Sequence, residues 1–285
     1  MSNLKIAVQK SGRLHQDSMQ LLKDIGISIN NGKDQLKASA QNFPLEIFYL
    51  RNGDIPQYLK DGVVDVAIIG ENVLAEKATD ILKLEKLGFS KCRVSIAIPK
   101  GVSYENVSDL EGKQIATSYP NTVNRFLEEN NINASIHVIN GSVEIAPNIG
   151  LADAIVDIVS SGSTLFKNNL TEKNVILTSE AVLSVSPKIS DSKQELLNTL
   201  RFRIRSVLKG RQSKYILLNA PDDKLNDIIK ILPGMNSPTV LPLAKKGWSS
   251  VHSVIDKNQF WEIIDALKQN GAEGILICSI EKMVI

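Results

Sequence analysis

GSVEIAPNIGLADAIVDIVSSGSTL, residues 141–165, is the stretch from which we predict the fold of this chain. Its apolar run Ala154–Val159 predicts a buried β-strand, because Pro147 and Gly150 interrupt any helix before it. Ser160–Thr164 follows, with one glycine among four hydroxyl side chains at the point where a helix is expected to begin. Backbone N–H groups and hydroxyls at such a junction converge on one anion. The stretch therefore predicts a phosphate-binding loop after a strand.

Three carboxylates accompany this loop. Glu144 lies in the polar turn before the strand, whereas Asp153 and Asp157 are four positions apart along it. Because alternate residues of a strand share a face, the two aspartates are predicted to point the same way, toward sugar hydroxyls or a divalent ion. A capped turn beside a solvated strand edge uses the same residue types, so this stretch alone leaves both interpretations open.

Two cations near the N-terminus have the same kind of setting. Leu4–Val8 predicts a strand, and the loop after it, with Lys10 and Arg13, leads into a helix with a repeating apolar face. The carboxyl ends of strands in an open sheet are where such folds bind ligands. Arg13 offers a bidentate fork and Lys10 a point charge for a triphosphate or pyrophosphate, although cations in a loop also occur as solvated surface.

Composition excludes several classes of function. The chain of 285 residues carries 33 Lys plus Arg against 31 Asp plus Glu, a net charge of only +2. That balance predicts no nucleic-acid partner and no membrane surface. Without a leader-like N-terminus or a long apolar run we expect a cytoplasmic protein. Cys92 and Cys278 lie far apart in apolar segments and are predicted to be core residues.

Strand and helix patterns alternate along most of the chain, which predicts an α/β fold with a mostly parallel sheet. We expect two lobes with a cleft between them, lobe I over residues 1–95 and 180–210 and lobe II over 96–179. A helical connector over 193–209 ends this region, and residues 211–285 have the order βαββαβ of a ferredoxin-like domain.

The motif residues resemble the signature of the ATP phosphoribosyltransferases, which open histidine biosynthesis. In the central stretch the residues that carry the resemblance are Glu144, Ala146, Pro147, Gly150, Ala152, Asp153, Asp157, Val159, Ser160, Gly162, Thr164 and Leu165. Matching segments occur in the expected order elsewhere, at residues 9–14, 54–56, 62–65, 70–72, 92–93 and 116–120. Ser161 departs from the threonine that is more common in the family and keeps the hydroxyl.

The resemblance implies a fold and a reaction. The fold is a two-lobed catalytic region, 1–210, similar to type II periplasmic binding proteins, followed by a regulatory domain that binds histidine. The reaction joins 5-phosphoribosyl 1-diphosphate to N1 of ATP, giving 1-(5-phosphoribosyl)-ATP and pyrophosphate with Mg²⁺ as cofactor. A loose, oxocarbenium-like transition state is expected, stabilised by electrostatics rather than by a covalent intermediate. Further implied partners are the inhibitors histidine and AMP and further copies of the chain, as dimer and hexamer.

Site residues are implied by the same resemblance. Those expected to bind 5-phosphoribosyl 1-diphosphate are Glu144, Asp153, Asp157, Ser160, Ser161, Gly162, Ser163 and Thr164. Those expected to bind ATP are Arg13, Arg51, Gly70 and Tyr119. The alternative interpretation of Tyr119 is a core tyrosine with a satisfied hydroxyl. The catalytic residues are expected to be Lys10, Arg13 and Asp153, the metal ligands Asp153 and Asp157, and the histidine ligands Asp222 and Thr239.

An alternative from another class is a non-catalytic sensor or partner subunit, since two lobes and a small domain also suit ligand binding alone. The phosphate-binding loop, the aspartates and the Lys10–Arg13 pair favour the enzyme, because a sensor has no need to combine them.

Overall fold

The computed structural model describes residues 3–30, 35–77, 80–232 and 237–284. The chain divides into two compact units, Met1–Leu197 and Asn198–Ile285. This division falls inside helix α6 (Gln194–Gln212), before the boundary expected at residue 210. None of the helices in the described ranges combines the length and the apolar character that a bilayer crossing requires.

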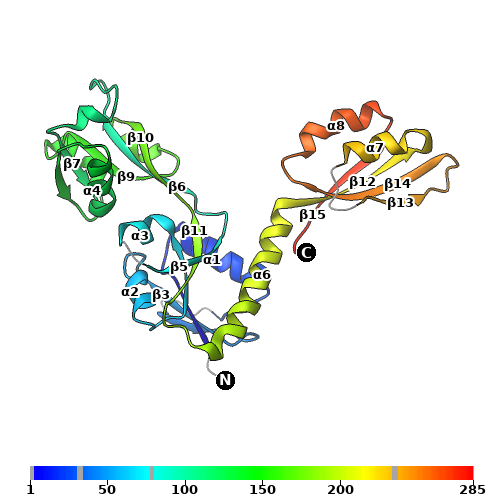
Figure 1. Ribbon diagram of the computed structural model, residues 1–285, viewed down its shortest axis with the longest axis horizontal. Coiled ribbons are helices and arrows are strands. Elements are labelled where there is room, and N and C mark those ends of the chain that lie inside the picture. The colour runs from blue at the N-terminus through cyan, green and yellow to red at the C-terminus, as the bar shows by residue number, and fades with distance from the viewer. Residues whose placement is uncertain (1–2, 31–34, 78–79, 233–236, 285) are drawn as a thin grey trace. The chain divides into compact units, whose positions relative to one another are not determined.

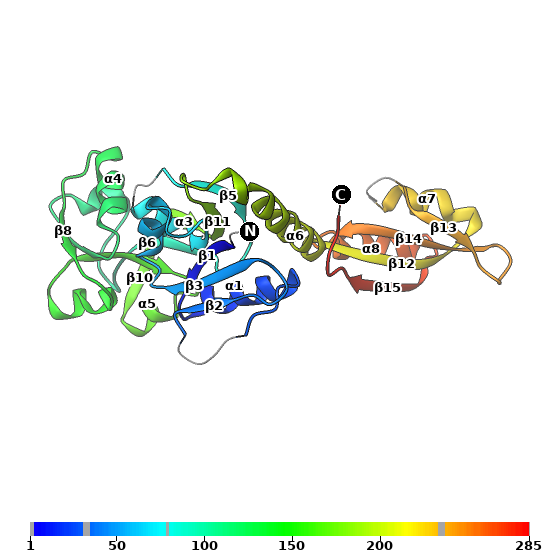
Figure 2. The ribbon, with the colours of Figure 1, turned by 90° about the horizontal axis from the view of Figure 1, so that it is seen from below.

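The first sheet of unit 1 has the strand order β2-β3-β1-β4-β11-β5, with β1 parallel to both β3 and β4. Its helix α1 packs against β1 (Figure 2), and the side chains of Leu14, Ser18, Leu21 and Leu22 are buried, as the apolar periodicity predicts. The elements of this lobe are β1 (Leu4–Gln9), α1 (Arg13–Asp24), β2 (Lys37–Ser39), β3 (Leu45–Leu50), α2 (Ile55–Lys60), β4 (Val66–Gly70), α3 (Glu71–Glu76), β5 (Leu82–Lys86) and β11 (Ala181–Val185).

The second sheet has the order β10-β6-β9-β7-β8, and β9 runs parallel to β7 but antiparallel to β6. Its core includes Val94, Ile115 and Val156, all fully or almost fully buried. The elements of this lobe are β6 (Cys92–Pro99), the 3-10 turn η1 (Val107–Leu110), β7 (Gln114–Thr117), α4 (Pro120–Glu129), β8 (Ser135–Val138), the 3-10 turns η2 (Val143–Ile145) and η3 (Pro147–Ile149), β9 (Ala154–Val159), α5 (Ser163–Lys167) and β10 (Leu170–Ser179).

The chain passes between the two sheets twice, from β5 to β6 and from β10 back to β11 (Figure 1). In the apolar run 63–69 the strand β4 begins only at Val66, and Val63 is half exposed. The cause is the end of α2: Gly62 has φ +75°, and Val63 N–H donates to Tyr58 O. That arrangement is a Schellman motif, which turns the chain away before the strand starts.

Unit 2 contains a four-stranded antiparallel sheet of order β13-β14-β12-β15. Its helices supply Ile228 and Leu267 to the core beside Ile216 and Val251, so both helices cover one face. The elements are β12 (Ser213–Pro221), the 3-10 turn η5 (Asp222–Lys224), α7 (Leu225–Ile231), β13 (Thr239–Pro242), β14 (Trp248–Asp256), α8 (Phe260–Gln269) and β15 (Glu273–Ser279). The element order βαββαβ and the order of the strands in the sheet confirm the ferredoxin-like prediction.

Neither cysteine is a core residue, so that prediction is wrong. Cys92 is half-buried and Cys278 is exposed. Cys278 lies on β15, where Ile275 and Ile277 point toward the helices. Because successive side chains of a strand alternate between faces, Cys278 points to the opposite side of the sheet.

Candidate active site

The serine-rich loop follows β9 directly, as the sequence predicts. Gly162 has φ +78° and precedes the short helix α5, and Ser161 Oγ donates to Ser163 Oγ at 3.1 Å. The loop encloses a small cavity of about 130 Å³. Its lining includes Glu144, Asp157, Ser160, Ser161, Gly162, Ser163 and Thr164. The structure thus gathers around one cavity all but one of the residues expected to bind the sugar phosphate.

Arg13, the first residue of α1 in the first lobe, reaches this loop. Its Nη2 donates to Ser160 Oγ at 2.9 Å and to the carbonyl oxygen of Lys91 at 3.0 Å. Arg13 as a residue remains exposed. A cation from one lobe therefore lies at the serine-rich loop of the other.

Arg93 also holds the loop, and sequence reasoning assigned it no role. It forms an ion pair with Glu172 on β10, and its Nη1 donates to the carbonyl oxygen of Ser160 at 3.1 Å. Ser95 Oγ donates to Glu172 at 2.8 Å. Hydrogen bonding to Arg93 lowers the pKa of Glu172, so the carboxylate stays ionised and the pair persists. Residues 92–93 belong to the segments that resemble the family, and that resemblance is the signal in the sequence for a role of Arg93.

Asp157 lines the loop cavity together with Glu144. Its Oδ1 accepts hydrogen bonds from Ile158 N–H at 2.8 Å and from Ser118 Oγ at 3.2 Å. Burial raises the pKa of Asp157, and the charge of Glu144 raises it further, against the two hydrogen bonds that lower it. A carboxylate whose charge is disfavoured by burial and by a neighbouring carboxylate is typical of a site that receives a cation or sugar hydroxyls.

Replacing Asp157 by Asn is expected to stabilise the ligand-free protein at pH 7. A carboxyl whose pKa is raised on folding binds its proton more tightly when folded, so stability falls as pH rises from about 3.9, the ordinary Asp value, through the raised value. The Asn amide oxygen can accept the same two hydrogen bonds without this cost. Thermal unfolding should give a higher Tm for Asp157→Asn at pH 7 and a smaller difference at pH 4. A Tm at pH 7 equal to or below that of wild type would contradict the assignment.

Asp153 is not brought to the loop. It lies just before β9, where its Oδ2 accepts the backbone N–H of Gln114 at 2.9 Å, and it lines a separate cavity beside Tyr104 and Lys113. Four residues of extended strand span about 13 Å, so Asp153 and Asp157 share a face but stand at opposite ends of β9. The two carboxylates thus line different cavities, and their joint role at one ligand stays a prediction.

Lys10, Arg51 and Gly70 lie at one edge of the first sheet, since they end or follow adjacent parallel strands. Lys10 N–H donates to Leu50 O at 2.8 Å, beside Arg51. Gly70 has a structural reason to be glycine, because a Cβ there would lie 2.3 Å from Asn72 Oδ1. Lys10 and Arg51 are exposed, whereas Gly70 is buried.

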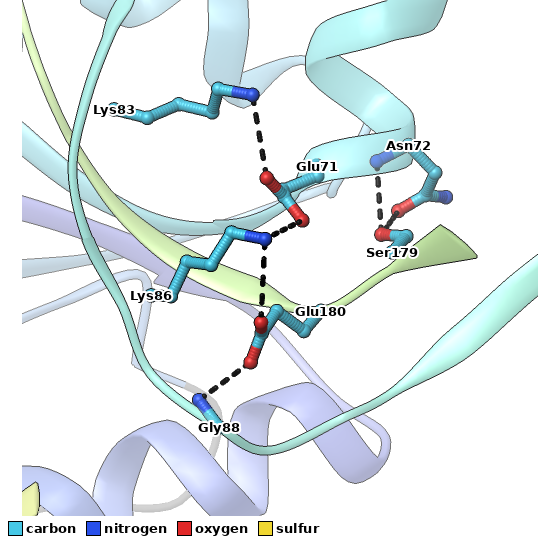
Figure 3. A network of polar contacts seen from close by, with 7 residues as sticks. All are labelled: Glu71, Asn72, Lys83, Lys86, Gly88, Ser179 and Glu180. Atoms are coloured by element: carbon cyan, nitrogen blue, oxygen red, sulfur yellow. Dashed lines mark hydrogen bonds and ion pairs between the residues drawn. The ribbon is translucent and has the colours of Figure 1, made fainter. Parts of the chain in front are cut away.

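Tyr119 is half-buried where β7 meets α4, and its hydroxyl accepts a hydrogen bond from Asn72 Nδ2 at 3.0 Å. Burial, followed by the charge of Asp157, raises the pKa of Tyr119, so the phenol stays protonated. Asn72 is in turn fixed by Ser179, which donates from Oγ to Asn72 Oδ1 and accepts Asn72 N–H (Figure 3). Tyr119 of the second lobe is thereby bound to α3 of the first.

A second cavity, of about 400 Å³, lies where the chain passes between the lobes. Glu180, which lies between β10 and β11, links this connection to the one between β5 and β6. Its carboxylate accepts a hydrogen bond from Gly88 N–H at 2.9 Å and forms an ion pair with Lys86 at 3.7 Å (Figure 3). Lys86 also pairs with Glu71 at 3.8 Å. The lining residues are Glu71, Lys86, Lys91, Cys92, Arg93, Ser160, Thr178, Ser179 and Glu180. This cavity therefore adjoins the serine loop through Ser160 and contains three cationic side chains.

Asp222 and Thr239 lie in unit 2 and are both exposed. Asp222 Oδ1 accepts a hydrogen bond from Ser249 Oγ at 2.7 Å. Thr239 on β13 lies opposite His252 on β14, and His252 is three residues after Ser249 on that strand. That offset is about 10 Å along a strand. The described residues include no group of three or more His, Cys, Asp or Glu side chains arranged to hold a metal ion.

Comparisons with known proteins agree on one family. The profile described as ATP phosphoribosyltransferase matches residues 51–206, and the profile of its C-terminal domain matches residues 210–282. An ATP phosphoribosyltransferase of Cytophaga hutchinsonii is 53% identical over 281 residues, 99% of this chain and 98% of the relative. That of Bacteroides thetaiotaomicron is 52% identical over 282 residues, 99% of this chain and 100% of the relative.

Solved structures support the same assignment. The ATP phosphoribosyl transferase (HisG:HisZ) complex from Thermotoga maritima matches with TM-score 0.63 at 32% identity, over 72% of this chain and 98% of that one. The protein Tv2483 bound to L-arginine matches with TM-score 0.51 at 15% identity, over 72% and 84%, which shows a shared fold alone. The predicted fold class is confirmed. The chain therefore belongs to the long form of the ATP phosphoribosyltransferase family, the transferases of the first step of histidine biosynthesis.

Proposed function

We propose that this chain transfers the phosphoribosyl group of 5-phosphoribosyl 1-diphosphate to N1 of ATP and releases pyrophosphate. The observation that carries the proposal is the contact of Arg13 with Ser160, which puts a cation of the first lobe at the anion-binding loop of the second. A fixed loop of N–H and hydroxyl donors suits the 5-phosphate, which keeps its charge throughout the reaction. The remaining donors of Arg13 suit the pyrophosphate, whose charge grows as it leaves.

The carboxylates have a separate role in this proposal. Asp157, near Glu144, contacts the ribose hydroxyls or a metal ion, and Asp153 is left out because it lines another cavity. Mg²⁺ in such sites is bound mainly by substrate phosphates and by one or two carboxylates. One protein carboxylate beside a phosphate loop fits that donor set, and Asp157 is the residue that would hold the ion. Bound there, Mg²⁺ would neutralise charge on the pyrophosphate.

ATP is assigned to the edge of the first sheet and the adjoining cavity. Lys10 and Arg51 are exposed cations at the ends of β1 and β3, and Lys86 and Lys91 line the neighbouring cavity. Tyr119 offers the face of its ring to adenine. N1 of adenine is uncharged near neutral pH, so the reaction needs orientation of two polyanions rather than a strong base. Gly70 leaves room for the Asn72 side chain, since a Cβ at Gly70 would lie 2.3 Å from Asn72 Oδ1.

Regulation is assigned to unit 2. We propose that this ferredoxin-like unit is the regulatory domain and binds histidine, with Asp222 and Thr239 on separate parts of its surface. Histidine and AMP are the proposed inhibitors, and the proposed assemblies are a dimer and a hexamer in the cytoplasm.

Pyrophosphate release tests the function. The purified chain with ATP, Mg²⁺ and 5-phosphoribosyl 1-diphosphate should release pyrophosphate and form a product with the mass of 1-(5-phosphoribosyl)-ATP. Omission of any one substrate should abolish the signal, and histidine should lower the rate. If both substrates bind but no pyrophosphate appears, the chain is a binding protein rather than this enzyme. A rate and an assembly state that histidine leaves unchanged would remove the regulatory role.

A further inference from the structure

The first turn of α4 is capped by a residue from the other lobe. A helix N-terminus leaves backbone N–H groups without partners, and no side chain at the N-cap position Tyr119 supplies one here. Instead, Asn121 N–H donates to Glu76 Oε1 and Thr122 N–H donates to Glu76 Oε2, both at 2.9 Å. Thr122 Oγ1 donates to the same Oε2 at 2.8 Å. One carboxylate thus accepts three hydrogen bonds from α4.

Glu76 is the last residue of α3 in the first lobe. The residue is only 7% exposed. Its backbone carbonyl accepts Asn121 Nδ2 at 2.9 Å, and Arg125 Nη2 donates to the carbonyl oxygen of Ala75 at 3.1 Å. Hydrogen bonds to an ionised acceptor are about twice as strong as neutral ones, and negative charge at a helix N-terminus is favourable. The end of α3 therefore binds the beginning of α4.

This contact bears on the site because α4 starts where the ligand residues lie. Ser118 and Tyr119 directly precede the helix, and Ser118 Oγ donates to Asp157. Asn72, which binds Tyr119, stands four residues before Glu76 and therefore on the same face of α3. The two α3 side chains therefore hold adjacent points of the second lobe.

We propose that Glu76 is a positioning residue that fixes the second lobe, with its serine loop, against the cations of the first lobe. The proposal rests on the proposed function for its kinetic consequence, but its geometric consequence does not depend on that function. Loss of the Glu76 cap should leave each lobe folded and let the two lobes take a range of mutual orientations.

Glu76→Gln is the primary variant, since it keeps the side-chain shape but removes the charge and turns one acceptor oxygen into a donor. Glu128→Gln is the matched control, because it makes the same change on the exposed face of α4, the helix that Glu76 caps. Thr122→Val and Thr122→Ser form an independent pair: the first removes the hydroxyl donor to Glu76 and the second keeps it.

Kinetics and an inter-lobe distance are measured together. Glu76→Gln should lower kcat about 10-fold or more and change KM for 5-phosphoribosyl diphosphate less than threefold, because most of that site belongs to the second lobe. Glu128→Gln and Thr122→Ser should match wild type, and Thr122→Val should resemble Glu76→Gln more weakly. Spin labels at positions 60 and 128, with Cys92 and Cys278 replaced by serine, should give a narrow distance distribution that Glu76→Gln broadens.

The outcomes separate the two claims. If no variant, wild type included, releases pyrophosphate, the proposed function fails, and the distance distribution alone decides the role of Glu76. An unchanged distribution in Glu76→Gln overturns the proposal whatever the kinetics. The proposal is also overturned if Glu76→Gln lowers kcat, the affinity for 5-phosphoribosyl diphosphate and the cooperativity of unfolding, because that pattern indicates general destabilisation. Should Glu76→Gln fail to fold, the Thr122 pair gives the same readouts.

Discussion

Arg13→Ala is expected to lower kcat/KM for pyrophosphate release about a hundredfold. Arg13 contacts Ser160 and Lys91 through Nη2, and its Nε and Nη1 hydrogens are the donors that we assign to a substrate phosphate. A hydrogen bond to a charged group contributes about 1.5–3 kcal/mol, and about 1.4 kcal/mol corresponds to a tenfold change. Loss of the fork removes at least one such contact, and it also releases Ser160 from the first lobe.

Arg13→Lys separates charge from geometry. Lysine keeps the positive charge but cannot donate in two parallel directions, so its activity should fall between wild type and Arg13→Ala. The measurement is steady-state pyrophosphate release over a matrix of both substrate concentrations. An alanine variant within twofold of wild type in kcat/KM would mean that Arg13 serves the structure of the loop and not the reaction.

Gly162→Ala is expected to raise KM for 5-phosphoribosyl 1-diphosphate about tenfold. Gly162 has φ +78°, and no atom lies within 4 Å of the position a Cβ would take, so the whole effect comes from the backbone. The left-handed conformation costs an L-residue about 1–2 kcal/mol. Relaxation of this strain would turn the N–H groups of Ser163 and Thr164 away from the cavity, so the loop would lose part of its anion site.

Gly112→Ala is the matched control for this variant. Gly112 lies in the same lobe with φ +68° and open space around it, but it does not line the loop cavity. Both variants should lose a similar amount of stability in chemical unfolding, whereas only Gly162→Ala should raise KM. Equal KM values for the two variants would show that the loop does not bind the substrate.

Local patterns were sufficient for much of this fold. The run 154–159 is β9 with the predicted bounds, because six consecutive apolar or strand-compatible residues between turn signals have few other structures available. The elements of unit 2 followed for the same reason, since each strand and helix of βαββαβ has its own periodicity. The serine loop was predictable because all its donors are consecutive in the sequence.

What the sequence could not predict depends on distant partners. Glu172 meets Arg93 across 79 positions, and Glu76 meets Thr122 across 46. No local pattern marks a glutamate as the cap of a helix in another lobe. The aspartates show a different limit: strand alternation predicts one face for Asp153 and Asp157, but it does not say that only one of them reaches the loop cavity.

The binding of 5-phosphoribosyl 1-diphosphate at residues 160–164 is the claim on which the function depends. The most direct measurement is a crystal structure of the chain with this substrate and Mg²⁺. We predict that the 5-phosphate accepts hydrogen bonds from the N–H groups after Gly162, that the ribose hydroxyls contact Asp157, and that the diphosphate lies toward Arg13. A sugar phosphate bound elsewhere, with the serine loop empty, would contradict it.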